Sequence, residues 1–105
     1  MAHNIDNVFS ALADSSRRQI LAMLSEKDMN VNSIAGKFKV SRPAISKHLR
    51  VLTRSKLVKP KQMGRQRYYS LNAAPLKEAE SWLKFYEKFW NEKLDLLKTF
   101  VEKNK

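Results

Sequence analysis

The basic residues of this chain are concentrated in one segment that contains no acid. Residues 29–72 hold eleven Lys or Arg and no Asp or Glu, whereas the remainder carries ten of each sign, so the net charge of +11 comes from this segment. A surface that is merely solvated normally mixes both signs. An acid-free basic segment therefore indicates a surface that binds a polyanion such as nucleic acid, although a solubilising basic face is the alternative.

The spacing within this segment predicts a helix-turn-helix over 31–55. Apolar residues recur at helical intervals over 31–38 and again over 42–55, with about three residues between the two helices. Ser41 is the expected N-cap of the second helix. Its apolar stripe consists of Ile45, Leu49 and Leu52. Such a helix fits the major groove of DNA, where its exposed N-terminal residues reach base edges.

Position on this helix sorts the polar side chains by expected role. Arginine and lysine bind guanine edges and a small methyl contacts thymine, so the expected base contacts are Arg42, Ala44, Ser46 and Lys47. The residues expected at the DNA backbone are Ser41, His48, Arg50, Arg54 and Lys56. For His48, packing at the edge of the helix is an equally weighted alternative.

A β-hairpin is expected directly after the second helix. Residues 57–63 and 66–71 have the composition of short strands, and Gly64 lies between them. Pro60 cannot donate to a central ladder, so it places the first strand at a sheet edge. The region 57–71 is thus a basic wing, and the side chains expected to reach phosphates or the minor groove are Arg65, Gln66 and Arg67.

Two helices are expected before the basic segment. The first is predicted by the helical spacing of Ile5, Val8, Phe9 and Leu12, with Asn4 as its N-cap. The second follows the capping residues 14–16 and ends near Glu26. Residues 27–30 are predicted to form a polar turn, with Asn30 capping the next helix.

A long helix over 73–103, capped by Asn72, is predicted at the C-terminal end. Its apolar residues form two adjacent stripes, and one stripe is enough to cover a small domain. We therefore expect a homodimer, although both stripes could instead wrap the same core. The residues expected at the dimer interface are Val8, Phe9, Leu83, Tyr86, Phe89, Trp90, Leu94 and Leu97.

Composition excludes several classes of protein. The chain has no cysteine, so it forms no disulfide and no thiolate metal site. No apolar run is long enough to span a bilayer and no signal peptide is recognisable, so we expect one cytoplasmic domain over 1–105. Neither a nucleophile–base pair nor a glycine-rich phosphate loop is evident, so we expect no enzyme and no cofactor. The competing hypotheses are a sequence-indifferent nucleic-acid binder and a winged-helix module that binds protein.

Three motifs, which follow one another in the family's order, resemble those of the ArsR-type winged helix-turn-helix regulators. They are ALADSSRRQIL at 11–21, VSRPAISKHLRVL at 40–52 and GRQRYYSL at 64–71. The similarity covers residues 5–72, and the family usually has proline where Ser15 stands. The resemblance implies a mainly α fold with a small β-hairpin, and a dimeric bacterial repressor that binds an inverted repeat of double-stranded DNA, with autorepression expected. It also implies dimerisation through the first and last helices.

The resemblance also bears on regulation. Many members sense metals through two cysteines in the helix before the turn, and the matching positions here are Asn30 and Asn32. A second family site uses histidine and carboxylates on the last helix, but the two histidines here are His3 and His48. A neutral amide does not replace a thiolate for a soft metal, so we expect a member that does not sense metals. The aromatic last helix resembles a subgroup encoded beside small partner proteins, which implies a regulatory protein partner.

Overall fold

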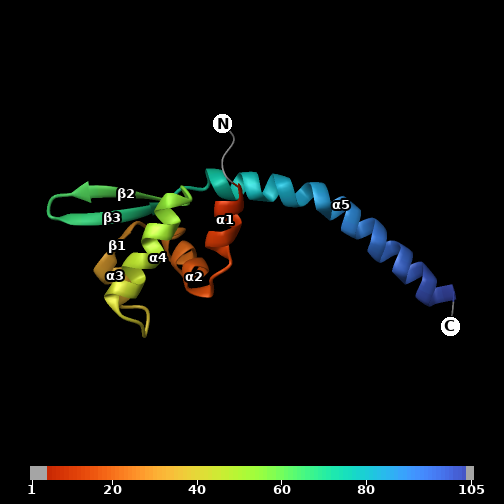
Figure 1. Ribbon diagram of the computed structural model, residues 1–105, viewed down its shortest axis with the longest axis horizontal. Helices are drawn as coiled ribbons and strands as arrows, with labels where there is room; N and C mark the ends of the chain where they lie inside the picture. The colour runs from red at the N-terminus through yellow and green to blue at the C-terminus, as the bar shows by residue number, and fades with distance from the viewer. Residues whose placement is uncertain (1–4, 104–105) are drawn as a thin grey trace.

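The computed structural model describes residues 5–103 and contains five helices and three strands in that range. In chain order the elements are α1 (Ile5–Leu12), α2 (Ser15–Leu24), β1 (Met29–Asn30), α3 (Val31–Ala35), α4 (Arg42–Arg54), β2 (Val58–Met63), β3 (Gln66–Leu71) and α5 (Ala74–Lys103). Helices α1 to α4 pack beside the hairpin, and α5 leaves this body as a long arm (Figure 1). The expected cap Asn4 lies outside the described residues.

The sheet is antiparallel, with the strand order β1-β3-β2. Its hairpin confirms the predicted wing, because Met63 pairs with Gln66 and Gly64 takes a φ of 63° in the turn between them. Pro60 lies on the edge strand β2, as predicted. Strand β1 falls in a segment predicted to be only a turn. It is two residues long and pairs with β3 across about forty positions, so no local period reveals it.

The helix before the turn is shorter than predicted. It ends at Ala35 rather than Phe38, and Gly36 is its C-cap. The next two N–H groups, of Lys37 and Phe38, donate three residues back, to Ile34 and Ala35. Such tight bonding ends an α-helix, and glycine has a low helix propensity. The connection to α4 is therefore six residues long instead of three, while α4 itself begins and ends within one residue of the prediction.

The core lies where the four short helices meet the sheet. Its largest fully buried side chains come from every layer: Ile20, Ile34, Ile45, Leu49, Leu52, Leu57, Val8 and Val58. Val8 was expected at a dimer interface, but it is 1% exposed and packs inside its own subunit. This residue of α1 is therefore part of the subunit's own core and leaves almost no surface for a second subunit.

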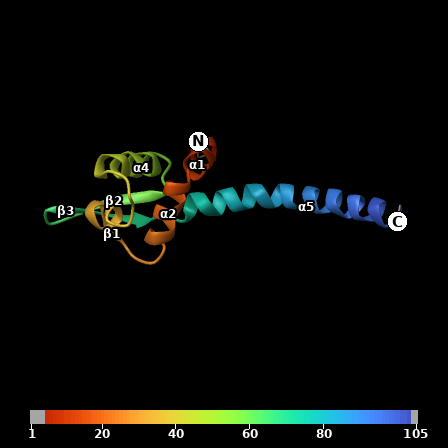
Figure 2. The same ribbon diagram turned by 90° about the horizontal axis from the view of Figure 1, so that it is seen from below.

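Helix α5 extends away from the core instead of folding over it (Figure 2). It has 30 residues, about 45 Å of helix, and only Pro75 and Ala79 are buried. The radius of gyration is 18.5 Å, against about 13 Å for a compact chain of this length. The alternative in which both stripes wrap one core is therefore wrong. Asn72 binds the Ala74 N–H at 3.5 Å, but the helix begins two residues after Asn72.

The chain leaves α4 through a turn in which Lys56 has a φ of 68°. The N–H of Leu57 donates to the carbonyl of Leu52 at 3.0 Å. The N–H of Lys56 donates to the carbonyl of Thr53, also at 3.0 Å. These bonds form a Schellman motif, whose left-handed residue is usually glycine. A side chain with a Cβ is strained there by about 1–2 kcal/mol.

We expect Lys56→Gly to be more stable than Lys56→Ala by about 1 kcal/mol in free energy of unfolding. Both variants remove the ammonium group, but alanine retains the Cβ that the left-handed conformation disfavours. Urea denaturation of the two variants measures the difference. Equal midpoints would show that no backbone strain is stored at this turn.

Candidate nucleic-acid interface

Helix α4 presents a basic face outward because its apolar stripe is completely buried. Ile45, Leu49 and Leu52 are each 0% exposed, as the sequence predicted. Ser41 caps the helix by accepting a hydrogen bond from the Ala44 N–H at 3.3 Å. The expected contact residues Arg42, Lys47, Arg50 and Arg54 are exposed, and Ala44 and Ser46 are half-buried. The face is therefore accessible along all its turns.

Helix α1 and three further elements hold α4 in place from the inside. Helices α2 and α3 and strand β2 all pack against it. Helix α3 in turn is capped by Asn30, whose side chain accepts a hydrogen bond from the Ser33 N–H at 2.8 Å. The same side chain donates through Nδ2 to Oε1 of Gln66 on β3. One asparagine thus joins the start of α3 to the first residue of β3, next to the hairpin turn.

His48 lies on the inner edge of α4, at its contact with α2. Its Nδ1 is 3.9 Å from Oδ2 of Asp14 and 3.4 Å from Nη1 of Arg17. Its side chain is 21% exposed. These contacts favour the packing alternative for His48 over a contact to the DNA backbone, because the ring is already turned toward α2.

Sequence reasoning missed the role of Arg17, which joins three helices. Its Nε donates to the carbonyl of Ala11 at 2.8 Å, and its Nη2 donates to that of Ser10 at 3.0 Å. Both acceptors are at the C-terminal end of α1, where free carbonyls attract a cation. Arg17 also contacts His48 on α4. The available signal was an arginine five residues after the end of α1, but only the fold reveals that α4 lies beside it.

Asp14 caps α2 as a charged group. Its carboxylate accepts from the Arg17 N–H at 3.1 Å. This hydrogen bond lowers the pKa of Asp14 below its ordinary value of 3.8; desolvation opposes the change, and the charges of His48 and Arg17 reinforce it. A lowered carboxyl pKa stabilises the folded state above that ordinary value, and the contribution is lost as the pH falls through the lowered pKa.

We expect Asp14→Asn to be less stable than the native chain at neutral pH. The gap in free energy of unfolding should close as the pH drops below 3.8, because the native carboxylate then becomes protonated. Asparagine is an equally good N-cap, so the comparison isolates the charge. Urea denaturation across this range measures the gap, with exposed Asp28→Asn, in the turn before β1, as the control. A gap that is constant with pH would contradict the assignment.

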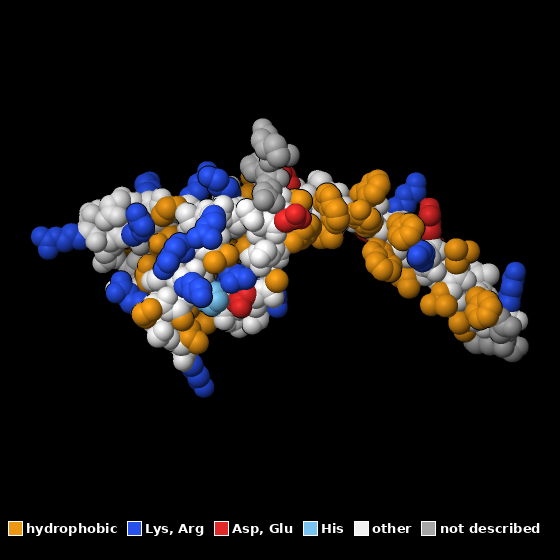
Figure 3. Space-filling model, viewed as in Figure 1, with side chains coloured by type: hydrophobic (Ala, Val, Ile, Leu, Met, Phe, Trp, Pro, Cys, Tyr) orange, Lys and Arg blue, Asp and Glu red, His pale blue; other side chains and the backbone are white. Residues whose placement is uncertain are grey.

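Basic side chains gather over the helix-turn-helix and the hairpin, and apolar side chains follow α5 (Figure 3). Arg65, Gln66 and Arg67 are exposed at the tip of the wing, in the position that the sequence predicted. Lys56 is exposed at the turn between α4 and β2. The basic face of α4 and the wing therefore lie at the same end of the molecule, away from the tip of α5.

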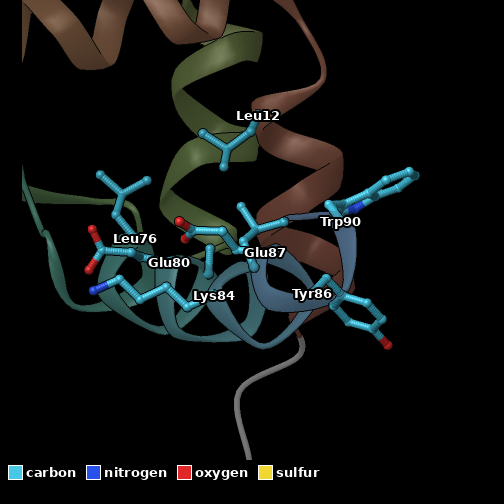
Figure 4. A pocket seen from close by; sticks show the side chains of 9 residues that line it. Leu12, Leu76, Glu80, Lys84, Tyr86, Glu87 and Trp90 are labelled. Atoms are coloured by element: carbon cyan, nitrogen blue, oxygen red, sulfur yellow. The ribbon is translucent and has the colours of Figure 1, made fainter. Parts of the chain in front are cut away.

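The apolar arm α5 offers a second surface, remote from the basic one. Phe9 of α1 meets Trp82 edge-on at 5.6 Å between ring centroids, so this expected interface residue is partly used inside the subunit. Beyond it, Leu83, Trp90, Leu94 and Leu97 are 53%, 60%, 59% and 58% exposed; Tyr86 and Phe89 are exposed as well. A groove of about 600 Å³ lies between Leu12 and this helix, and the Tyr86 and Trp90 rings extend outward beside it (Figure 4).

Known proteins agree with this architecture. The family model "Bacterial regulatory protein, arsR family" matches residues 14–59. Transcriptional repressor SdpR of Bacillus subtilis is 38% identical over 75% of this chain and 88% of its own length. The transcriptional repressor SmtB homolog of Synechocystis sp. is 41% identical over 67% of this chain, which spans only 53% of that relative. An ArsR-like transcriptional regulator from Rhodococcus sp. RHA1 superimposes with a TM-score of 0.79 at 34% identity, over 93% of this chain and 90% of that one.

The fold and the basic face define a winged helix-turn-helix regulator that binds DNA. The chain belongs to the ArsR family of bacterial regulatory proteins. Its relatives are transcription regulators, which points away from enzymatic activity. Among residues 5–103, no helix is long and apolar enough to cross a membrane. In the same range, no group of three or more histidine, aspartate or glutamate side chains is arranged to hold a metal ion.

Proposed function

We propose that this chain is a homodimeric repressor that binds an inverted-repeat operator and represses its own promoter. The observation that carries the proposal is the orientation of α4: its apolar stripe is fully buried while Arg42, Lys47 and Arg50 are exposed. A helix held in this way enters the major groove with its N-terminal turns toward the bases. The relatives named as repressors support the sign of regulation.

The contacts divide between bases and backbone. Ala44, Ser46 and Lys47 lie in the first two turns of α4 and are proposed to touch base edges. Arg50, Arg54, Lys56 and the two wing arginines are proposed to neutralise phosphates, and Ser41 and Gln66 are proposed to donate hydrogen bonds to them. Because His48 faces Asp14 and Arg17, we propose that it positions α4 rather than binding DNA.

Dimerisation through α1 and α5 is proposed because most apolar side chains of α5, from Leu83 onward, are exposed in the single subunit. An exposed apolar surface of this extent marks an interaction site. A two-fold pair places two reading helices about 34 Å apart, one turn of DNA. Any apolar arc of α5 that remains free in the dimer is where we propose that a regulatory protein partner would bind.

We further propose that the protein responds to no soft metal. The positions that the resemblance assigns to cysteines hold Asn30 and Asn32. Asn30 already caps α3 and binds Gln66, so its amide has a structural role. Thermal stability of the purified protein should be unchanged by Zn²⁺, whereas a shift of the midpoint that saturates with metal would contradict the proposal.

Binding of the purified protein to labelled duplex DNA at increasing salt tests the DNA-binding proposal. The logarithm of affinity should fall with the logarithm of salt with a slope of several units, because each neutralised phosphate contributes about 0.9. Competition with unrelated duplex and with RNA separates the sequence-indifferent alternative. A flat salt dependence would contradict the proposal, and equal competition by all three nucleic acids would favour the alternative.

A further inference from the structure

A cleft on the basic surface lies where α3, α4 and the wing meet. Its volume is about 280 Å³, which compares with about 30 Å³ for one water molecule, so it has room for a hydrated ionic group. Three arginines from two parts of the chain line it: Arg42 begins α4, and Arg65 and Arg67 lie at the wing tip. The other described lining residues include neutral amides but no carboxylate.

The walls of this cleft are held by hydrogen bonds rather than by the arginines themselves. Asn30 donates to Gln66 and thereby fixes the wing against the start of α3. At the tip, Gln62 Nε2 donates to the carbonyl of Gly64 at 3.2 Å. Every residue of β2 from Val58 to Met63 is paired with a residue of β3, up to this turn. The three arginines therefore line a site whose frame exists before any ligand binds.

We propose that this cleft binds a phosphate group through the guanidinium groups of Arg42, Arg65 and Arg67. Guanidinium binds phosphate oxygens through paired, charge-assisted hydrogen bonds. Three cations that line one cleft without an acid repel one another, and a bound phosphate relieves that repulsion. Guanidinium groups bind the phosphate oxygens of a DNA phosphodiester, a free phosphate and a nucleotide through the same hydrogen bonds.

The position of the cleft points to the DNA backbone as the source, and in this respect the inference rests on the proposed function. When a helix occupies the major groove and a wing reaches the adjacent minor groove, the strand that separates the two grooves passes between them. The cleft lies between α4 and the wing. Arg42 is then a backbone contact that sets the register of α4, and it does not read guanine. Sequence reading falls to Ala44, Ser46 and Lys47.

The test compares Arg42→Ala, Arg67→Ala and the double variant with Lys98→Ala, an exposed cation on the distant α5. Each is measured on the best duplex selected from a random pool and on an unrelated duplex. The two single variants should lose about tenfold on both duplexes, and each should lower the salt slope by about one unit. The double variant should lose less than the product of the single losses, because both side chains bind one phosphate. Lys98→Ala should match the native chain.

A parallel titration of the DNA-free protein with inorganic phosphate, at constant ionic strength, identifies the source. Saturable binding that disappears in the double variant supports a site that also accepts a free anion. Absence of such binding, together with the uniform losses on DNA, supports a site for the DNA backbone alone. Losses confined to the selected duplex, or fully multiplicative losses without phosphate binding, would overturn the inference. If the native chain binds no duplex, the proposed function fails, and the phosphate titration alone decides whether the cleft is an anion site.

Discussion

Lys47→Ala is expected to weaken binding to the selected operator about 5- to 150-fold and to relax the preference at one base pair. Lys47 is exposed in the second turn of α4, where a cationic side chain reaches guanine O6 and N7. A specific base contact of this kind is worth about 1–3 kcal/mol of discrimination. Affinity measured against a set of operators with single base changes reports both effects.

The control for this prediction is Lys98→Ala, which removes the same charge from α5. It should leave both affinity and base preference unchanged. If Lys47→Ala weakens all duplexes by the same factor, Lys47 contacts phosphate and sequence reading lies elsewhere on α4. If Lys47→Ala and Arg42→Ala both weaken none, α4 is not the reading helix, and a module that binds protein becomes the better account.

The double variant Leu94→Glu/Leu97→Glu is expected to be monomeric at micromolar concentration. These two side chains are 59% and 58% exposed in the isolated subunit, so charges there leave the core intact. In a dimer they would lie buried and unpaired, which is strongly unfavourable. Operator affinity should fall about 100-fold or more, since the two half-sites would no longer be bound by one linked molecule. Sedimentation equilibrium measures the mass.

The matched control is Asn91→Glu/Lys98→Glu, which places the same number of new glutamates on the polar arc of α5. This variant should remain dimeric, and circular dichroism should show equal helix content in both variants. A dimeric Leu94→Glu/Leu97→Glu protein would exclude this part of α5 from the subunit interface and would leave its apolar surface to another partner.

The elements set by local periodicity were predictable from the sequence. Helix α4 carries its own cap, Ser41, and an apolar stripe of period 3.6, so its bounds agree within a residue. The hairpin has a glycine in its turn and a proline on its edge. Strand β1 was not predictable in this way, since its two residues form a strand only through β3. Helix α3 ends early because the N–H groups after Gly36 donate hydrogen bonds three residues back. The apolar spacing, which continues to Phe38, does not indicate this change.

The site was predictable as a face but not as a set of contacts. Spacing alone indicated that Arg42 and Lys47 lie off the buried stripe of α4. The cleft that Arg42 shares with the wing, and the contacts of His48 with Asp14 and Arg17, join segments 23 or more positions apart. Helix α5 illustrates the same limit. The apolar arc of α5 predicted a partner. Only the fold reveals that most of this helix does not pack on its own domain.

A nuclease footprint of the purified protein on the DNA upstream of its own gene tests the central claim most directly. We expect protection of an inverted repeat whose half-sites are centred about 34 Å apart and which overlaps the promoter. The Leu94→Glu/Leu97→Glu variant should lose this protection at concentrations that saturate the native protein. Absence of protection by the native protein on this DNA, under conditions in which it is folded and dimeric, would contradict the account.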